Sequence, residues 1–183
     1  MRKEQKANYP ESARGAAALL VRMVLEDGAY TNIALNQYLR GSRLSDLDRR
    51  LATELVYGTV KASGTLDWYL AQCVSRPLDK VAGDILAILR ISTYQLLYMT
   101  RIPASAAVNE AVKLARSVSH EGSAKFVNGV LRGLLRKQEA GAFVLPDAEK
   151  QDADYLSLKY YHPRWLVKRW LGPWGRGGTE RLL

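Results

Sequence analysis

The sequence is poor in residues on which several kinds of protein site depend. Its 183 residues include one cysteine, Cys73, and two histidines, His120 and His162. A lone cysteine excludes an intrachain disulfide and a cysteine-based metal site. The two histidines lie too far apart in the sequence to suggest a metal cluster. Cys73 follows apolar residues at helical spacing, so we interpret it as a packed thiol and expect no metal site.

Long apolar runs and the patterns of β-structure are also missing. The segment richest in apolar residues, 81–99, is interrupted by Asp84 and Arg90, so we expect no membrane-spanning helix and no membrane partner. The N-terminus lacks the apolar core of a signal peptide. Period-two alternation and hairpin dipeptides between such runs do not occur. These absences predict a cytoplasmic protein of the all-α class.

The residue patterns of common catalytic sites are absent as well. The sequence has no glycine-rich dinucleotide loop after a strand, no phosphate-binding Gly-Lys-Ser/Thr loop and no His-Glu-x-x-His helix. Paired carboxylate chemistry needs two acids in one cleft, but Glu110 has only Asn109 and Asn128 as polar companions. We interpret these three residues as a structural polar core that joins helices by hydrogen bonds. No catalytic residue is predicted in this chain.

Apolar residues repeat at helical spacing along most of the chain. The pattern, its caps and its breaks predict about seven helices, over residues 10–27, 31–39, 45–63, 65–76, 81–99, 103–118 and 123–138. The segment 81–99 is apolar nearly all round and should lie at the centre. Further helices are expected over 152–161, over 164–171 and from Thr179 onward. We therefore divide the chain into a basic flexible arm (1–9), a helical bundle (10–140), and a linker with the beginning of another helical region (141–183).

Positive charge is the strongest feature that is present. Lysine and arginine number 27 against 18 acidic residues, a formal charge of +9, which attracts nucleic acid or an anionic membrane surface. On the last bundle helix, Lys125, Arg132 and Arg136 fall within roughly 40° of one another, opposite the apolar residues. An ordinary solvated helix face is the alternative interpretation. Gly129 and Gly133 on this helix permit close helix packing, and Gly129, which lies beside the basic residues, alternatively permits close approach of a phosphate backbone.

The C-terminal segment combines cations with aromatic rings. Between Tyr155 and Thr179 there are five basic residues and no acidic one, together with Trp165, Trp170 and Trp174. Such a mixture can stack on unpaired bases while it neutralises phosphates, which suits RNA. The alternative is that the tryptophans pack this segment onto a neighbouring domain.

Several motifs of the bundle together resemble the signature of NusB-like domains. They are Ile-Ser-Thr-Tyr-Gln-Leu-Leu-Tyr at 91–98, Ile-Pro at 102–103, Ala-Val-Asn-Glu-Ala-Val at 107–112 and Lys-Phe-Val-Asn-Gly-Val-Leu-Arg at 125–132. The resemblance covers about residues 10–138 and implies a NusB-like, all-helical bundle that binds RNA. We expect the RNA contacts in the arm and on the last helix, at Arg2, Lys3, Lys6, Arg14, Lys125, Arg132 and Arg136.

The segment that follows the bundle separates two groups of this family. Tyr-His-Pro-Arg-Trp-Leu at 161–166 is similar to the segment through which ribosomal RNA cytosine-C5 methyltransferases of the Sun/RsmB type continue into their catalytic domain. That likeness implies a non-catalytic domain that positions 16S rRNA for a catalytic domain C-terminal to it. S-adenosylmethionine would be the cofactor of the parent enzyme, with none in this chain, and the abrupt end after Thr179 is expected of a fragment.

Two other functions stay open. The first is a stand-alone transcription antitermination factor of the NusB type, which binds RNA together with a small-subunit ribosomal protein. The second is a docking module whose charge serves only solubility. A homodimer of the isolated chain is a further possibility that these residues leave open.

Overall fold

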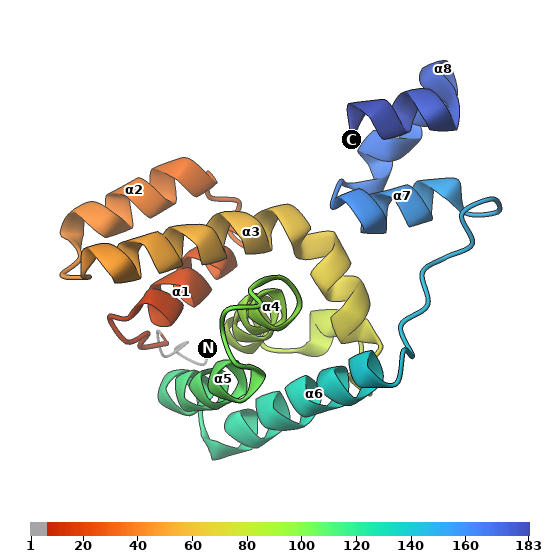
Figure 1. Ribbon diagram of the computed structural model, residues 1–183. Helices are drawn as coiled ribbons and strands as arrows, with labels where there is room; N and C mark the ends of the chain where they lie inside the picture. The colour runs from red at the N-terminus through yellow and green to blue at the C-terminus, as the bar shows by residue number, and fades with distance from the viewer. Residues whose placement is uncertain (1–6) are drawn as a thin grey trace, which may run out of the picture.

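Residues 7–183 are described by a computed structural model and contain helices but no strand (Figure 1). The bundle consists of α1 (Ala13–Leu25), α2 (Thr31–Gly41), α3 (Asp46–Ala71), the short 3-10 helix η1 (Leu78–Lys80), α4 (Gly83–Tyr98), α5 (Ala104–Val118) and α6 (Glu121–Glu139). A C-terminal extension consists of α7 (Asp152–Tyr160) and α8 (Arg164–Leu182). The predicted all-α class is therefore confirmed. No helix within residues 7–183 has the length and apolar character needed to cross a membrane.

Helix α4 lies at the centre of the bundle, as its uniformly apolar sequence predicts. Residues 85–89 and Ile91 are buried, and α4 packs against α1, α3, α5 and α6. Figure 1 looks nearly along its axis, with the other bundle helices around it. Because burial of one large aliphatic side chain stabilises the folded state by about 1.5–3 kcal/mol, the buried side chains of α4 contribute substantially to core stability.

Helix α3 differs from the prediction of two helices separated at Ser63-Gly64. It is continuous from Asp46 to Ala71 and carries Gly64 in its interior. Buried residues on both sides of the glycine, among them Ala62 and Leu66, pack the helix along the core, and this packing outweighs the helix propensity of one glycine, about 1 kcal/mol. The described bundle therefore has six α-helices and η1 where the sequence predicted about seven helices.

Two helix ends also differ from the prediction. Helix α6 begins at Glu121, two residues before the expected Ser123, because the His120 ring accepts a hydrogen bond from the Ser123 amide and caps the helix. Helix α8 extends past residue 171 to Leu182, but the non-helical backbone of Gly175 (φ 59°, ψ −178°) divides it into two helical stretches. Thr179 does not begin a new helix. Its hydroxyl donates a hydrogen bond to the Gly175 carbonyl at 2.7 Å.

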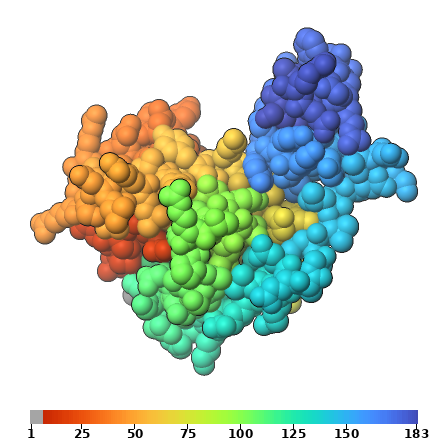
Figure 2. Space-filling model, in the orientation of Figure 1, coloured from red at the N-terminus to blue at the C-terminus, as the bar shows by residue number. Residues whose placement is uncertain are grey.

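The extension forms a lobe beside the bundle and contacts α3 and the end of α4 (Figure 2). The Thr65 hydroxyl of α3 donates a hydrogen bond to the Leu158 carbonyl of α7 at 3.2 Å. Phe143, in the connecting segment, packs edge-on against Tyr69 with ring centres 4.8 Å apart. Tyr161 packs in the same way against Tyr98 of α4 at 5.3 Å. Aromatic contacts therefore hold the extension against the bundle.

Candidate nucleic-acid interface

Helix α6 presents one apolar face to the core and one basic face to solvent. Its buried residues are Ala124, Val127, Val130, Leu131 and Leu134, which lie on the arc that the sequence assigned to the core. Lys125, Arg132 and Arg136 are exposed on the opposite side. The predicted division of this helix into a docking face and a cationic face is present in the structure.

Arg132 is held in place by a neighbour on its own helix. The Asn128 amide oxygen accepts a hydrogen bond from Arg132 Nε at 2.9 Å, one helical turn away. This contact orients the side chain of Arg132, which is exposed on the outer face of α6. Sequence reasoning missed this role because it assigned Asn128 to a polar core.

The predicted structural polar core of Asn109, Glu110 and Asn128 is wrong. Asn109 is exposed, and Glu110 accepts a hydrogen bond from Lys113 on the surface of α5 at 3.1 Å. The core-facing residues of this helix are Ala107, Val108, Ala111, Leu114 and Ala115, so Asn109 and Glu110 point outward. Within residues 7–183 the observed side-chain hydrogen bonds of these polar residues stay inside their own helices.

Two further cations flank α6 that the sequence analysis did not identify. The Arg76 guanidinium lies 4.7 Å from the centre of the Phe126 ring, a cation–π contact. Arg76 and Lys80 line a surface hollow of about 320 Å³ together with His120 and Phe126. Arg76 precedes Pro77 and Lys80 ends the short helix η1, and neither lies in a segment long enough for helical periodicity to give a signal. We call Arg76, Lys80, Lys125, Arg132 and Arg136 together the cationic face.

The cationic face keeps its charge available for a ligand. Within the described part of the chain, none of its five members lies within 4 Å of a carboxylate oxygen. Glu121, in the first turn of α6, is bound by Arg116 at 2.6 Å, and this hydrogen bond holds the pKa of Glu121 below its usual value. An unpaired cluster of this kind attracts phosphate groups more strongly than one neutralised by acidic neighbours.

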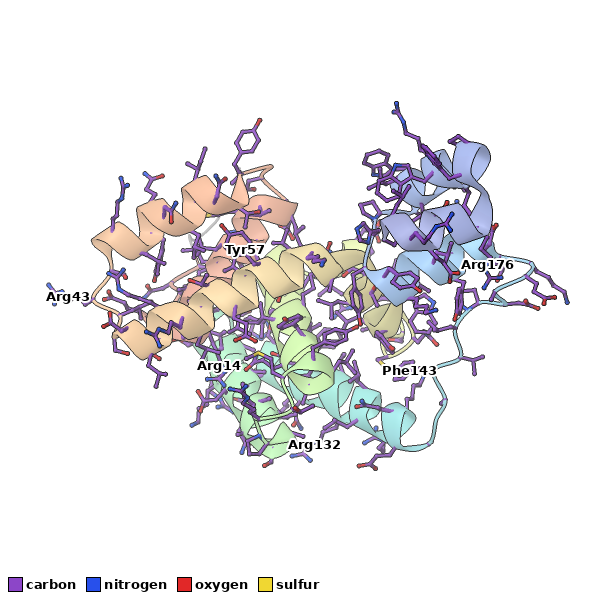
Figure 3. All side chains as sticks on the ribbon, turned by 45° about the horizontal axis from the view of Figure 1, so that its top comes forward. Arg14, Arg43, Tyr57, Arg132, Phe143 and Arg176 are labelled. Carbon is purple, nitrogen blue, oxygen red and sulfur yellow. The ribbon has the colours of Figure 1, made fainter. Side chains whose placement is uncertain are left out.

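Of the RNA contacts predicted near the N-terminus, the structure describes only Arg14. Arg2, Lys3 and Lys6 lie outside the described residues. Arg14 is half-buried on α1, where its Nε donates a hydrogen bond to the side-chain oxygen of the buried Gln95 at 2.8 Å. Figure 3 shows Arg14 and Arg132 on different helices. Arg14 therefore ties α1 to α4, and no described contact joins it to the cationic face.

The beginning of the described chain is anchored to α4. The Tyr9 hydroxyl donates a hydrogen bond to the Asp84 carboxylate in the first turn of α4. Ala82 and Ile85, on either side of this position, line the same hollow as Arg76 and Lys80. This hydrogen bond ties the segment before α1 to the N-terminal end of α4.

Gly129 lies on the cationic face and has no packing role within the described chain. It is exposed, and a Cβ atom added to it would meet no heavy atom within 4 Å. The interpretation that Gly129 permits close helix packing is therefore wrong for residues 7–183. Close approach of a phosphate backbone stays a prediction for this position.

Cys73 lies half-buried after the end of α3. Burial raises the pKa of its thiol, an effect that nearby Lys137 opposes. A thiolate is the nucleophilic form of cysteine, so this environment does not favour nucleophilic chemistry at neutral pH.

The tryptophans of the extension are largely exposed. Trp165 and Trp174 have 66% and 62% of their surface accessible to solvent, whereas Trp170 is half-buried near the His162 ring. The two exposed rings are therefore available to a ligand or to another domain.

Comparison with known proteins identifies the bundle. The sequence profile of the NusB family matches residues 11–136. The chain belongs to the NusB family. The match extends from the beginning of α1 almost to the end of α6 and therefore includes the α6 part of the cationic face.

Relatives of this NusB family chain are similar beyond the bundle. The chain is 40% identical over 171 residues to a probable ribosomal RNA small subunit methyltransferase B of Synechocystis, and this alignment covers 93% of the chain and 37% of the relative. It is 36% identical over 171 residues, with the same coverage, to the protein of that description from Bacillus subtilis. The chain thus spans little more than a third of the length of these relatives.

Solved NusB structures share the fold of the bundle. A structure of the antitermination factors NusB and NusE with double-stranded RNA aligns with a TM-score of 0.63 at 20% identity, over 69% of this chain and 95% of that one. T. maritima NusB also aligns with a TM-score of 0.63, at 21% identity, over 73% of this chain and 98% of that one. At these identities the alignments support the fold alone.

Proposed function

We propose that this chain binds ribosomal RNA of the small subunit and positions it for the S-adenosylmethionine-dependent cytosine-C5 methyltransferase activity of a longer cytoplasmic protein. The observation that carries the proposal is the cationic face, five exposed or solvent-facing cations without acidic partners among residues 7–183. Phosphate contacts of such a surface supply affinity without reading the base sequence. The N-terminal arm, with Arg2, Lys3 and Lys6, would extend this contact.

The similarity of the extension favours a methyltransferase over a stand-alone antitermination factor. The alignment with the Synechocystis methyltransferase covers 93% of the chain, whereas NusB structures align with 69–73% of it. An alignment of 171 residues is longer than the bundle and supports a sequence similarity that reaches into the extension, whereas the NusB structures align over about the length of the bundle. An interaction with a small ribosomal protein is the expectation for an antitermination factor, and its stoichiometric co-purification with the natural gene product would support that alternative.

We infer that the chemistry of methyl transfer lies outside the described residues. The family resemblance implies a cysteine thiolate as nucleophile and a glycine-containing strand end that holds the cofactor. Cys73 has a raised pKa, and residues 7–183 contain no strand. We therefore assign S-adenosylmethionine and the nucleophile to the catalytic domain of the longer protein, with which this chain would act as a partner.

The first prediction concerns charge reversal on α6. The variant Arg132→Glu/Arg136→Glu should bind a small-subunit rRNA fragment about ten- to a hundredfold more weakly than the parent at moderate salt, because two phosphate contacts become repulsive. If the parent neutralises about four phosphates, the slope of log K against log salt should be about −3 to −4, and the variant should have a shallower slope. Fluorescence anisotropy across a salt series measures both quantities.

A matched control reverses two arginine charges at a different place on the bundle. Arg43 and Arg50 are exposed, and Figure 3 shows Arg43 at the end farthest from the extension. Arg43→Glu/Arg50→Glu lowers the net charge equally and should keep most of the parent's affinity. Equal losses of RNA affinity in the two variants would show that binding depends only on net charge. An Arg132→Glu/Arg136→Glu variant with the parent's affinity would show that α6 is not part of the interface.

A further inference from the structure

A cavity of about 540 Å³ lies between α3 and the extension. Its walls include Lys61, Gly64 and Trp68 of α3 on one side, and Tyr161, His162 and Arg164 of the extension on the other. Pockets of about 300–1,000 Å³ are of the size that takes a small ligand or one nucleotide. The cavity is distinct from the cationic face, because none of the five cations of that face lines it.

The glycine in the α3 wall is not required by the packing of the chain. A Cβ atom on Gly64 would meet no heavy atom within 4 Å, yet glycine destabilises a helix interior relative to alanine. By contrast, a Cβ atom on Gly58, two turns earlier, would lie 2.1 Å from the Tyr94 ring. The absence of a side chain at Gly64 keeps this wall of the cavity open to a ligand.

The opposite wall contains a residue in an unusual backbone conformation. Tyr161 has φ 60° and ψ 36°, and it is the one residue other than glycine with positive φ among those described. This conformation is uncommon for a bulky side chain, and here it ends α7, where the Tyr161 amide donates a hydrogen bond to the Ser157 carbonyl. Tyr161 is held there by edge-on packing against Tyr98, so its position in the cavity wall is fixed by the bundle.

The chemistry of the walls suits an unpaired nucleotide. Trp68, Tyr161 and His162 supply flat rings on which a base can stack, and Lys61 supplies a cation for a phosphate. Asp154, a carboxylate that also lines the cavity, is bound by the Arg164 guanidinium, with Nη2 donating to Oδ2 at 3.1 Å. This ion pair lowers the repulsion that a phosphate would otherwise meet.

Helix α8 continues the same chemistry away from the cavity. Trp165 directly follows Arg164 and is 66% exposed, and Lys168 and Arg169 are exposed one turn later. The segment from Tyr155 to Thr179 has five basic residues and no acidic one. A single strand that enters the cavity would therefore meet further cations and an exposed indole ring along α8.

We propose that the cavity between α3 and α7 binds one unpaired nucleotide of an RNA strand, whose neighbouring nucleotides follow α8. This inference rests on the proposed RNA-binding function and adds to it a site for single-stranded RNA. The cationic face would hold phosphates of either paired or unpaired RNA, whereas the cavity would hold an unpaired base.

The test fills the cavity without removing any charge. Gly64→Leu places a side chain in the open space beside Gly64, and Gly41→Leu is the matched control, since Gly41 also lies on a helix with nothing within 4 Å of its Cβ position. Binding of hexauridine and of a short blunt-ended RNA duplex is measured for the full chain. Gly64→Leu should lose at least about tenfold in affinity for hexauridine and keep its affinity for the duplex, whereas Gly41→Leu should keep both.

The outcomes separate this inference from the proposed function. Hexauridine binding by Gly64→Leu at the parent's affinity overturns the cavity site while the RNA-binding function stands. A parent chain that binds neither RNA overturns the proposed function itself. Ultraviolet cross-linking of 4-thiouridine-labelled hexauridine to the parent tests the site without any substitution. Cross-links in the tryptic peptides 62–80 and 160–164 support it, and cross-links confined to α6 contradict it.

Discussion

Gly58 is the residue whose small size most directly permits the packing of α3 against α4. A Cβ atom at this position would lie 2.1 Å from Cζ of the Tyr94 ring, and that ring is itself packed against Tyr98 with centres 5.4 Å apart. Gly58→Ala must therefore displace the Tyr94 ring or separate the two helices. We expect a destabilisation of about 1–3 kcal/mol, the usual cost of overpacking, measured as a lower midpoint of urea unfolding.

Two companion variants make this prediction specific. Gly41→Ala, where the added methyl group meets nothing within 4 Å, should leave stability unchanged or raise it, because alanine is the better helix former. Truncation of the ring in Gly58→Ala/Tyr94→Ala should make the added methyl group tolerable, so the two changes should cost less than the sum of the single variants. A urea midpoint for Gly58→Ala equal to that of the parent would show that Tyr94 gives way freely.

Helices α3 and α4 are also joined by a bidentate ion pair between an arginine and a carboxylate. Arg90 Nε donates to Asp67 Oδ1 at 2.7 Å and Nη2 donates to Oδ2 at 2.8 Å, and the Arg90 side chain is only 12% exposed. Loss of either partner leaves the other charge poorly solvated. A double-mutant cycle with Asp67→Ala and Arg90→Ala should give a coupling free energy of about 1–3 kcal/mol.

An exposed pair on another helix is the control for this cycle. Lys113 and Glu110 of α5 lie 3.1 Å apart with side chains 69% and 44% exposed, and such surface pairs contribute about 0.2–1 kcal/mol. A coupling between Asp67 and Arg90 no larger than that between Lys113 and Glu110 would contradict a structural role for the pair between α3 and α4.

The elements show which features a sequence can predict and which it cannot. Periodicity located α4 and the two faces of α6, because both depend on neighbours one or two helical turns apart. The expected break at Ser63-Gly64 was wrong, since packing on both sides of Gly64 keeps α3 continuous. Arg76 escaped notice because its place beside Phe126 depends on a contact between residues 50 positions apart in the sequence. Sites that depend on long-range contacts therefore needed the structure.

The same limit applies to the cavity, which depends on how the extension meets the bundle. The sequence identified the aromatic and basic character of the C-terminal segment but not the surface of α3 on which it lies. That surface is fixed by the contact of Tyr161 with Tyr98 and by the hydrogen bond between Thr65 and Leu158. The joint between extension and bundle is therefore central to the whole molecule, and it contains titratable tyrosines.

Alkaline pH should weaken this joint through Tyr98. Burial, and then its interaction with Tyr161, raises the pKa of Tyr98 above the usual value near 10. The folded state thus favours the neutral phenol, so its contribution to stability is complete below about pH 10 and is lost as the pH rises further. Urea unfolding at about pH 9 and about pH 11 should show a smaller loss of stability for Tyr98→Phe than for the parent.

Tyr57→Phe, at an exposed tyrosine of α3, is the control for this prediction and should lose as much stability as the parent does. An equal loss of stability in Tyr98→Phe and in the parent would show that another group causes the alkaline loss. Tyr9 would be the next tyrosine to replace, because burial and the neighbouring Asp84 also raise its pKa.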